Sequence, residues 1–162
     1  MAVDVIHSSH KHGQALEKHA RKKCGGKWYD MNDMAMTSKL IENELYEKLI
    51  NNINFTSKMW DSVSLIFSES GTDLTGYRFF DGDWEGFGPK GFDWLKPAKA
   101  LHKISTNEGK PWKKMLMSLS KEKETYTIEY EYVDDSRWKL GGKDLSSIEE
   151  FAYSLKRKNG EV

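Results

Sequence analysis

A strict alternation of apolar and polar residues late in the chain constrains the fold more than any other feature. Residues 125–133 read TYTIEYEYV, with Tyr126, Ile128, Tyr130 and Tyr132 at one set of alternate positions and Thr125, Thr127, Glu129 and Glu131 at the other. Because successive side chains of a strand point to opposite faces of a sheet, this pattern predicts a strand with one face in the core and one acidic face in water.

The strand patterns of this chain come in adjacent pairs. Residues 112–120 are joined to the TYTIEYEYV strand by the charged turn KEKE at 121–124. Earlier in the chain, residues 62–68 alternate, and a turn at 70–73 leads into the return strand 74–80. Two strands joined by a short turn form an antiparallel hairpin, so we expect two hairpins.

Amphipathic helix patterns precede, separate and follow the two hairpins. The first covers roughly residues 38 to 53, and the second has Pro97 in its first turn. The third begins at Ser146, which has capping-box spacing with Glu149. This order predicts an α+β fold in which an antiparallel four-stranded sheet of two hairpins has its helices packed on one face.

Residues 1–35 differ from the rest of the chain. They carry an excess of lysine and arginine and most of the histidines, namely His7, His10, His12 and His19. The segment from Gln14 to Cys24 has a thin apolar face and is expected to form at most a short basic helix. We therefore expect residues 1–35 to be a basic, His-rich arm or short helix, and residues 36–162 to be a single α+β domain.

Composition limits the expected partners and location. The formal net charge is +0, which argues against a dedicated nucleic-acid-binding protein because phosphate binding depends on an excess of cations. The single cysteine, Cys24, excludes a disulfide framework. No apolar run approaches the roughly 18 residues of a membrane span. We expect a cytoplasmic protein that contacts neither a membrane nor nucleic acid.

Residues 77–94, YRFFDGDWEGFGPKGFDW, interleave large aromatic residues with acids and glycines. A buried strand excludes acids and a disordered linker carries few rings, so we expect an ordered, partly exposed loop that binds a protein partner. The alternative interpretation is a long hairpin loop whose rings fold back over the core. The partner-binding residues expected in this stretch are Tyr77, Phe80, Asp81, Asp83, Trp84, Glu85, Phe87, Asp93 and Trp94.

A second set of acids extends the expected partner-binding surface beyond this loop. Its members lie on the polar face of the TYTIEYEYV strand and just after that strand, and they are Glu129, Glu131, Asp134 and Asp135. Carboxylates on an exposed face attract a partner of positive charge. Both sets together predict a basic protein as the partner.

No residue pattern indicates an active site. The spacing of the histidines and Cys24 fits no zinc motif, and the chain contains neither HExxH nor CxxC. It contains no nucleophile turn of the form GxSxG, and the segment GGKD at 141–144 lacks the hydroxyl residue of a phosphate loop. We therefore expect a protein that is not an enzyme and that uses no catalytic residue, metal or cofactor.

Several segments from Met36 onward match the layout of one family. They are SKLIENELYEKLINNI in the first helix, MWDSVSLIFSESG and GYRFFDG in the first hairpin, and EGKPWKKMLMSLSKEKETYTIEYEYVDD in the second hairpin. On these segments, residues 36 to about 138 resemble the YezG-like family of bacterial immunity proteins, the antitoxins of polymorphic and contact-dependent growth inhibition toxin systems. Residues 1–35 are extra, because that family usually begins near the first helix.

The resemblance implies an antitoxin that binds the C-terminal domain of a cognate toxin, often a basic nuclease, and blocks it without catalysis. An acidic and aromatic surface agrees with such a partner. The alternative function is a nuclease or a nucleic-acid-binding protein that works through residues 1–35. In that alternative, the four histidines of this segment act as general acid and base, and Lys22 and Lys23 bind phosphate.

Overall fold

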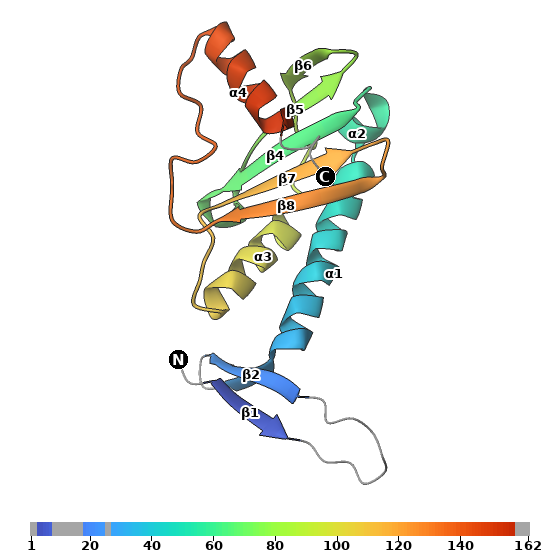
Figure 1. Cartoon of the computed structure of the whole chain (residues 1–162). Helices are drawn as coiled ribbons and strands as arrows, with labels where there is room; N and C mark the ends of the chain where they lie inside the picture. The colour runs from blue at the N-terminus through green and yellow to red at the C-terminus, as the bar shows by residue number, and fades with distance from the viewer. Residues whose placement is uncertain (1–2, 8–17, 25–26, 158–162) are drawn as a thin grey trace.

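The computed structural model describes residues 3–7, 18–24 and 27–157 of the chain. Within these ranges the chain forms a three-stranded antiparallel sheet near its N-terminus and a five-stranded antiparallel sheet around which the helices are arranged (Figure 1). The described part is therefore α+β, as the order of the sequence patterns predicts.

The smaller sheet consists of β1 (Val3–His7), β2 (Lys18–Cys24) and β3 (Lys27–Asp30). The long helix α1 (Met31–Ile50) and the short helix α2 (Ile53–Ser57) lead to the larger sheet. The elements that follow are β4 (Ser62–Ser68), β5 (Asp73–Phe80), β6 (Asp83–Gly86), α3 (Leu95–Asn107), β7 (Lys114–Ser120), β8 (Thr125–Glu131) and α4 (Leu145–Arg157). A short 3-10 turn, Glu69–Gly71, joins β4 to β5.

Both predicted hairpins are present. β4 pairs with β5, and β7 pairs with β8. The two hairpins are joined by the pairing of β4 with β7, which gives the strand order β6-β5-β4-β7-β8. At this junction Leu65 lies opposite Met117, and Ile66 lies opposite Leu116. The junction therefore places apolar side chains on both faces of the sheet.

The prediction of four strands is wrong, because the chain after β5 folds back and adds β6 as a fifth strand. Asp81 and Gly82 form the turn between them, and both have positive φ angles, 48° and 79°. Two consecutive positive φ angles are typical of the type I′ turn of tight hairpins, which favours the sequence Asp-Gly. The Asp-Gly pair is therefore the signal in the sequence that indicates this third hairpin.

The prediction that the helices pack on one face of the sheet is also wrong. α1, α2 and α3 cover one face, and α4 covers the other (Figure 1). Along β4, Leu65 packs with the first three helices, whereas Ile66 packs with Ala152 and Leu155 of α4. Every residue from 63 to 67 is buried, so β4 is a strand with two covered faces rather than one.

The N-terminal segment contains a sheet where the sequence predicts an arm or a short helix. Lys18–Cys24 forms the middle strand β2, so the expected helix from Gln14 to Cys24 is wrong there, and residues 14–17 lie outside the described residues. Strand pairing satisfies the backbone groups of a segment that has little apolar face to dock as a helix. β2 and β3 lie against α1, which begins at Met31 and not near residue 38.

The last helix is capped by Asp144 and not, as predicted, by Ser146. The Asp144 carboxylate accepts hydrogen bonds from the backbone N–H of Ser147 over 3.0 Å and from the hydroxyls of Ser147 and Ser146 over 2.7 Å and 3.0 Å. These bonds, with the Ser147 hydroxyl first, lower the pKa of Asp144 to about 2. An ionised carboxylate at this position pairs with a free N–H group and with the positive end of the helix dipole.

Deleting residues 1–30 should leave a cooperatively folded protein, because α1 and the complete five-stranded sheet with its two covered faces remain. We expect the free energy of unfolding to change by no more than about 1 kcal/mol, because both apolar clusters identified among the described residues lie within residues 41–155. Thermal melting of the truncated and full-length chains measures this change. A truncated chain without a cooperative transition would show that the smaller sheet is an integral part of the domain.

Candidate partner-binding surface

Three aromatic residues expected to anchor a partner lie in the core instead. Tyr77, Phe87 and Trp94 are only 6%, 7% and 7% exposed. The ring of Phe87 packs edge-on against Phe55 with centroids 4.8 Å apart, and the ring of Trp94 packs against Phe67 at 5.7 Å. The interpretation in which the rings fold back over the core is therefore correct for these three, and none of them offers an exposed anchor.

The other two expected rings, Phe80 and Trp84, are half-buried. The guanidinium of Arg78 lies over the Phe80 ring, 4.3 Å from its centroid. Trp84 packs against Tyr77 with centroids 5.9 Å apart and keeps part of its ring in solvent. Phe92, which is 78% exposed, has more of its ring in water than either. Both rings lie next to exposed acids of the β5–β6 hairpin, because Phe80 precedes Asp81 and pairs with Asp83, and Trp84 follows Asp83.

Hydrogen bonds fix the backbone of this hairpin turn, which carries exposed carboxylates. Asp81 donates its backbone N–H to the carboxylate of Asp61 over 3.1 Å. The carboxylate of Asp83 accepts the backbone N–H of Trp84 over 2.8 Å. Asp61, Asp81 and Asp83 are all exposed. We call Asp61, Asp81, Asp83 and Trp84 the acidic tip.

Two residues that the sequence analysis missed support the acidic tip. Asp61 lies just before β4 and binds the turn through its carboxylate. Tyr153 on α4 donates its hydroxyl to the carbonyl of Gly82 over 3.0 Å. Asp61 could have been found from its position beside the predicted strand. No local pattern marks Tyr153, because it contacts a residue 71 positions away in the sequence.

Among the described residues, Asp81 and Asp83 form no ion pair.

Glu85, on the same hairpin, is instead paired within the fold. Its carboxylate accepts a hydrogen bond from Nε of Arg78 over 2.6 Å and lies 3.6 Å from Nζ of Lys58. The bond from Arg78 is the main cause that lowers the pKa of Glu85. Arg78 is buried and also donates to the carbonyl of Met59, so this ion pair ties β6 to β5 and to the chain that enters β4.

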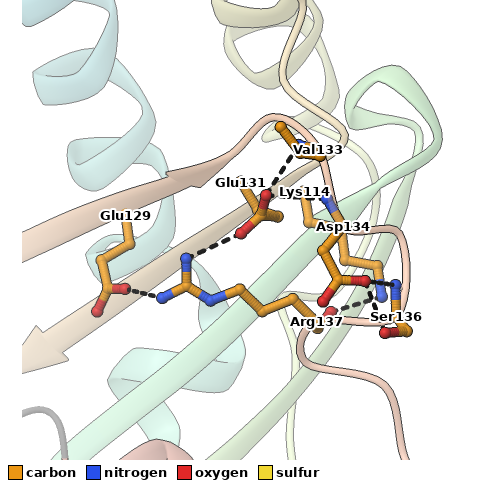
Figure 2. Close-up of polar contacts among 7 residues, drawn as sticks. All are labelled: Lys114, Glu129, Glu131, Val133, Asp134, Ser136 and Arg137. Carbon is orange, nitrogen blue, oxygen red and sulfur yellow. Dashed lines mark hydrogen bonds and ion pairs between the residues drawn. The ribbon is translucent and has the colours of Figure 1, made fainter.

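At the other end of the sheet, one arginine bridges the acids of β8 (Figure 2). Arg137 donates from Nη2 to Glu129 over 2.8 Å and from Nη1 to Glu131 over 3.0 Å. The second oxygen of Glu131 accepts the backbone N–H groups of Val133 and Asp134 over 2.8 Å and 3.0 Å. These two N–H groups, with that of Asp134 first, and then the Arg137 guanidinium lower the pKa of Glu131 to about 2.

The remaining acids expected in this region are paired as well. Asp134 accepts the hydroxyl and the backbone N–H of Ser136, which together lower the pKa of Asp134. The carboxylate of Asp135, which is largely exposed, lies 3.1 Å from Nζ of Lys113. We call Glu129, Glu131, Asp134 and Asp135 the β8-end cluster. Each of its carboxylates has a hydrogen-bond or ion-pair partner within the chain.

The expected residues therefore do not form one continuous surface. The acidic tip lies at the β6 edge of the sheet, and the β8-end cluster lies at the opposite edge. Asp93 belongs to neither, because it lines an open hollow with Glu44, Glu47 and Asn51. The sequence analysis missed Arg137, although its position directly after an acidic turn is a signal that it could pair with those acids.

No group of three or more His, Cys, Asp or Glu side chains within the described ranges could hold a metal ion. His7 and His19 lie on β1 and β2, whereas His10 and His12 lie outside the described residues. In the same described ranges, no helix combines the length with the apolar character that crossing a bilayer requires.

Comparison of the chain with protein-family models, with curated proteins and with solved structures found no match. The resemblance to the YezG-like family therefore stays a prediction. Because a fold by itself does not assign a function, the function has to be argued from the chemistry of these surfaces.

Replacing Glu131 with Gln should destabilise the protein near neutral pH and much less in acid. Folding lowers the pKa of Glu131 from 4.5 to about 2. The ionised carboxylate therefore contributes its full stabilisation above about pH 4.5, and this contribution is lost as the pH falls toward about 2. Urea midpoints of E131Q and of the unchanged protein should differ more at about pH 7 than at about pH 2.5.

Glu122→Gln is the matched control, because Glu122 is exposed in the turn between β7 and β8. It should shift the urea midpoint little at either pH. A difference between E131Q and the unchanged protein that stays constant over this range would mean that Glu131 is not held as an ionised acceptor in the folded state.

Proposed function

We propose that this protein is an immunity protein, an antitoxin that binds a cognate bacterial toxin domain and covers its active site or substrate path. The observation that carries the proposal is the acidic tip. There, Asp81 and Asp83 are exposed, form no ion pair with another described residue, and lie beside the half-buried Trp84. The expected partner is a basic toxin domain with nuclease activity, and the expected place of action is the bacterial cytoplasm.

Exposed carboxylates beside an aromatic ring suit a nuclease as the partner. A nuclease binds phosphate through lysine and arginine, so its substrate channel carries a positive potential. The carboxylates of the acidic tip, carried on an ordered turn, are drawn to that positive potential, which speeds association. The ring of Trp84, packed on one side by Tyr77, can add apolar contact with little loss of rotamer freedom. Such inhibition requires no chemical step by the antitoxin.

The acidic tip is also ordered before any partner arrives. The bond from Asp81 to Asp61 fixes one side of the turn, and the bond from Tyr153 to Gly82 fixes the other. A partner that docks there does not have to order the loop. Ordering would otherwise cost about 0.5–1.5 kcal/mol for each side chain immobilised.

The β8-end cluster is a weaker candidate for steering a basic partner. Arg137 neutralises Glu129 and Glu131, and Lys113 lies against Asp135. A partner would have to displace these cations before it gained the same contacts. The acidic tip carries no such internal competition among the described residues, so the proposal places the main contact there.

The double variant Asp83→Lys with Trp84→Ala should weaken toxin binding by more than about 2 kcal/mol, which is about thirtyfold in the dissociation constant. The change removes the expected anchor and reverses one charge of the acidic tip. The partner for the measurement is the toxin domain recovered by pull-down from the native strain, and titration calorimetry gives the affinity. Protection of cells that express the toxin should fall in parallel.

Glu44→Lys is the matched control, since it reverses one exposed charge on α1, a helix that makes none of the hydrogen bonds of the acidic tip. It should leave affinity and protection unchanged. If the double variant binds and protects as well as the unchanged protein, the acidic tip is not the toxin-binding surface.

A further inference from the structure

β8 is an edge strand whose outer side has no partner among the described residues (Figure 1). The carbonyl of Glu131 accepts the N–H of Lys113 over 2.7 Å, so the backbone groups of Glu131 point toward the β7 side. Backbone groups alternate in direction along an antiparallel strand. Those of Tyr126, Ile128 and Tyr130 therefore point outward, and each offers one N–H donor and one C=O acceptor to a further strand.

The usual protections of an edge strand are missing from β8. Edge strands are commonly shortened, bulged, or marked with lysine, proline or uncompensated charge. β8 runs over seven residues, contains neither lysine nor proline, and has no positive φ angle within its span. Its two carboxylates, Glu129 and Glu131, are bridged by Arg137. The opposite edge strand, β6, is protected by its length of four residues and by the tight turn that precedes it.

The sequence of β8 is complementary to itself in one antiparallel register. When two copies pair around Ile128, Glu129 of each copy lies opposite Thr127 of the other, and Glu131 lies opposite Thr125. On the other face Tyr126 lies opposite Tyr130, which is a favourable cross-strand aromatic pair. No two carboxylates are directly opposed. The outward groups of the two strands form roughly six backbone hydrogen bonds in this register.

The helix α1, which contacts β8, also carries exposed apolar side chains. Lys39 of α1 lies over the Tyr126 ring at 4.5 Å, and Asn43 accepts the Tyr126 hydroxyl. Leu40 and Met36, one helical turn apart on the neighbouring flank of α1, are 64% and 60% exposed. A second copy seated on β8 brings its own α1 to the same face, where these side chains can be covered.

We infer that this edge binds a second copy of the chain, with β8 pairing antiparallel to β8 around Ile128 so that the two sheets become one. The contact is modest in size, so the dimer forms at high protein concentration rather than being obligate. The inference is independent of the proposed function, because the acidic tip lies at the opposite edge of the sheet and stays open in the dimer.

Thr127 gives a charge test of this register, because it is exposed and would face Glu129 of the partner copy. Thr127→Glu opposes two carboxylates at two symmetric positions and should weaken dimerisation at least about tenfold. Thr127→Lys places a cation at the same positions and should leave dimerisation equal or stronger. Sedimentation velocity of the full chain from about 2 µM to about 500 µM measures the association.

Both variants should melt at the temperature of the unchanged protein, since Thr127 is not part of the core. About 1 M salt should restore part of the association of T127E, because salt screens exposed like charges. A monomer throughout the concentration range would overturn the inference. A dimer that T127E leaves intact, or that T127K weakens as much as T127E does, would also overturn it, because the interface or its register would then be different.

Discussion

The pairing of β4 with β7 is the constraint on which the rest of the structure depends, because these two strands are buried on both faces. Leu65 and Ile66 point to opposite faces and are 0% and 4% exposed, and Met117 and Leu116 lie opposite them. α1 and α3 bury their apolar sides on one face of this pair, and α4 does so on the other. Truncating one such side chain costs about 2–5 kcal/mol. That is a large part of the roughly 5–15 kcal/mol that keeps a domain folded.

A buried arginine connects this central pair to the acidic tip. Arg78 lies on β5, and its guanidinium contacts Glu85, the carbonyl of Met59 and the rings of Phe80 and Phe87. A buried cation is tolerated only when its donors are satisfied. This requirement positions β6 and the chain before β4 at the same time. The hairpin whose turn carries Asp81 and Asp83 is therefore positioned by a charge that is itself buried.

Local periodicity was sufficient to predict two of the three hairpins of the larger sheet and the existence of α1, α3 and α4, but not their arrangement. The alternation in β8 shows which residues share a face, whereas the face on which α4 docks depends on Ile66 and Leu116, which lie far from it in sequence. The acids of the candidate surface could likewise be found from composition. Their pairing could not, because Arg137 reaches back along β8 and Tyr153 reaches the turn from another helix. Contacts of this kind arise only after the sheet has formed.

The acids at the two edges of the sheet differ in whether a cation within the chain pairs with them. The two edges therefore form two different kinds of surface. At the β6 edge the strand is short, and Asp81 and Asp83 form no ion pair with another described residue, so the edge repels another acidic strand and attracts a basic surface. At the β8 edge Arg137 compensates Glu129 and Glu131 and leaves a regular strand with outward backbone groups. Without that guanidinium, the two carboxylates would act as the charged protection that edge strands usually carry. The arginine that helps to lower the pKa of Glu131 therefore also determines whether β8 is an open edge or a protected one.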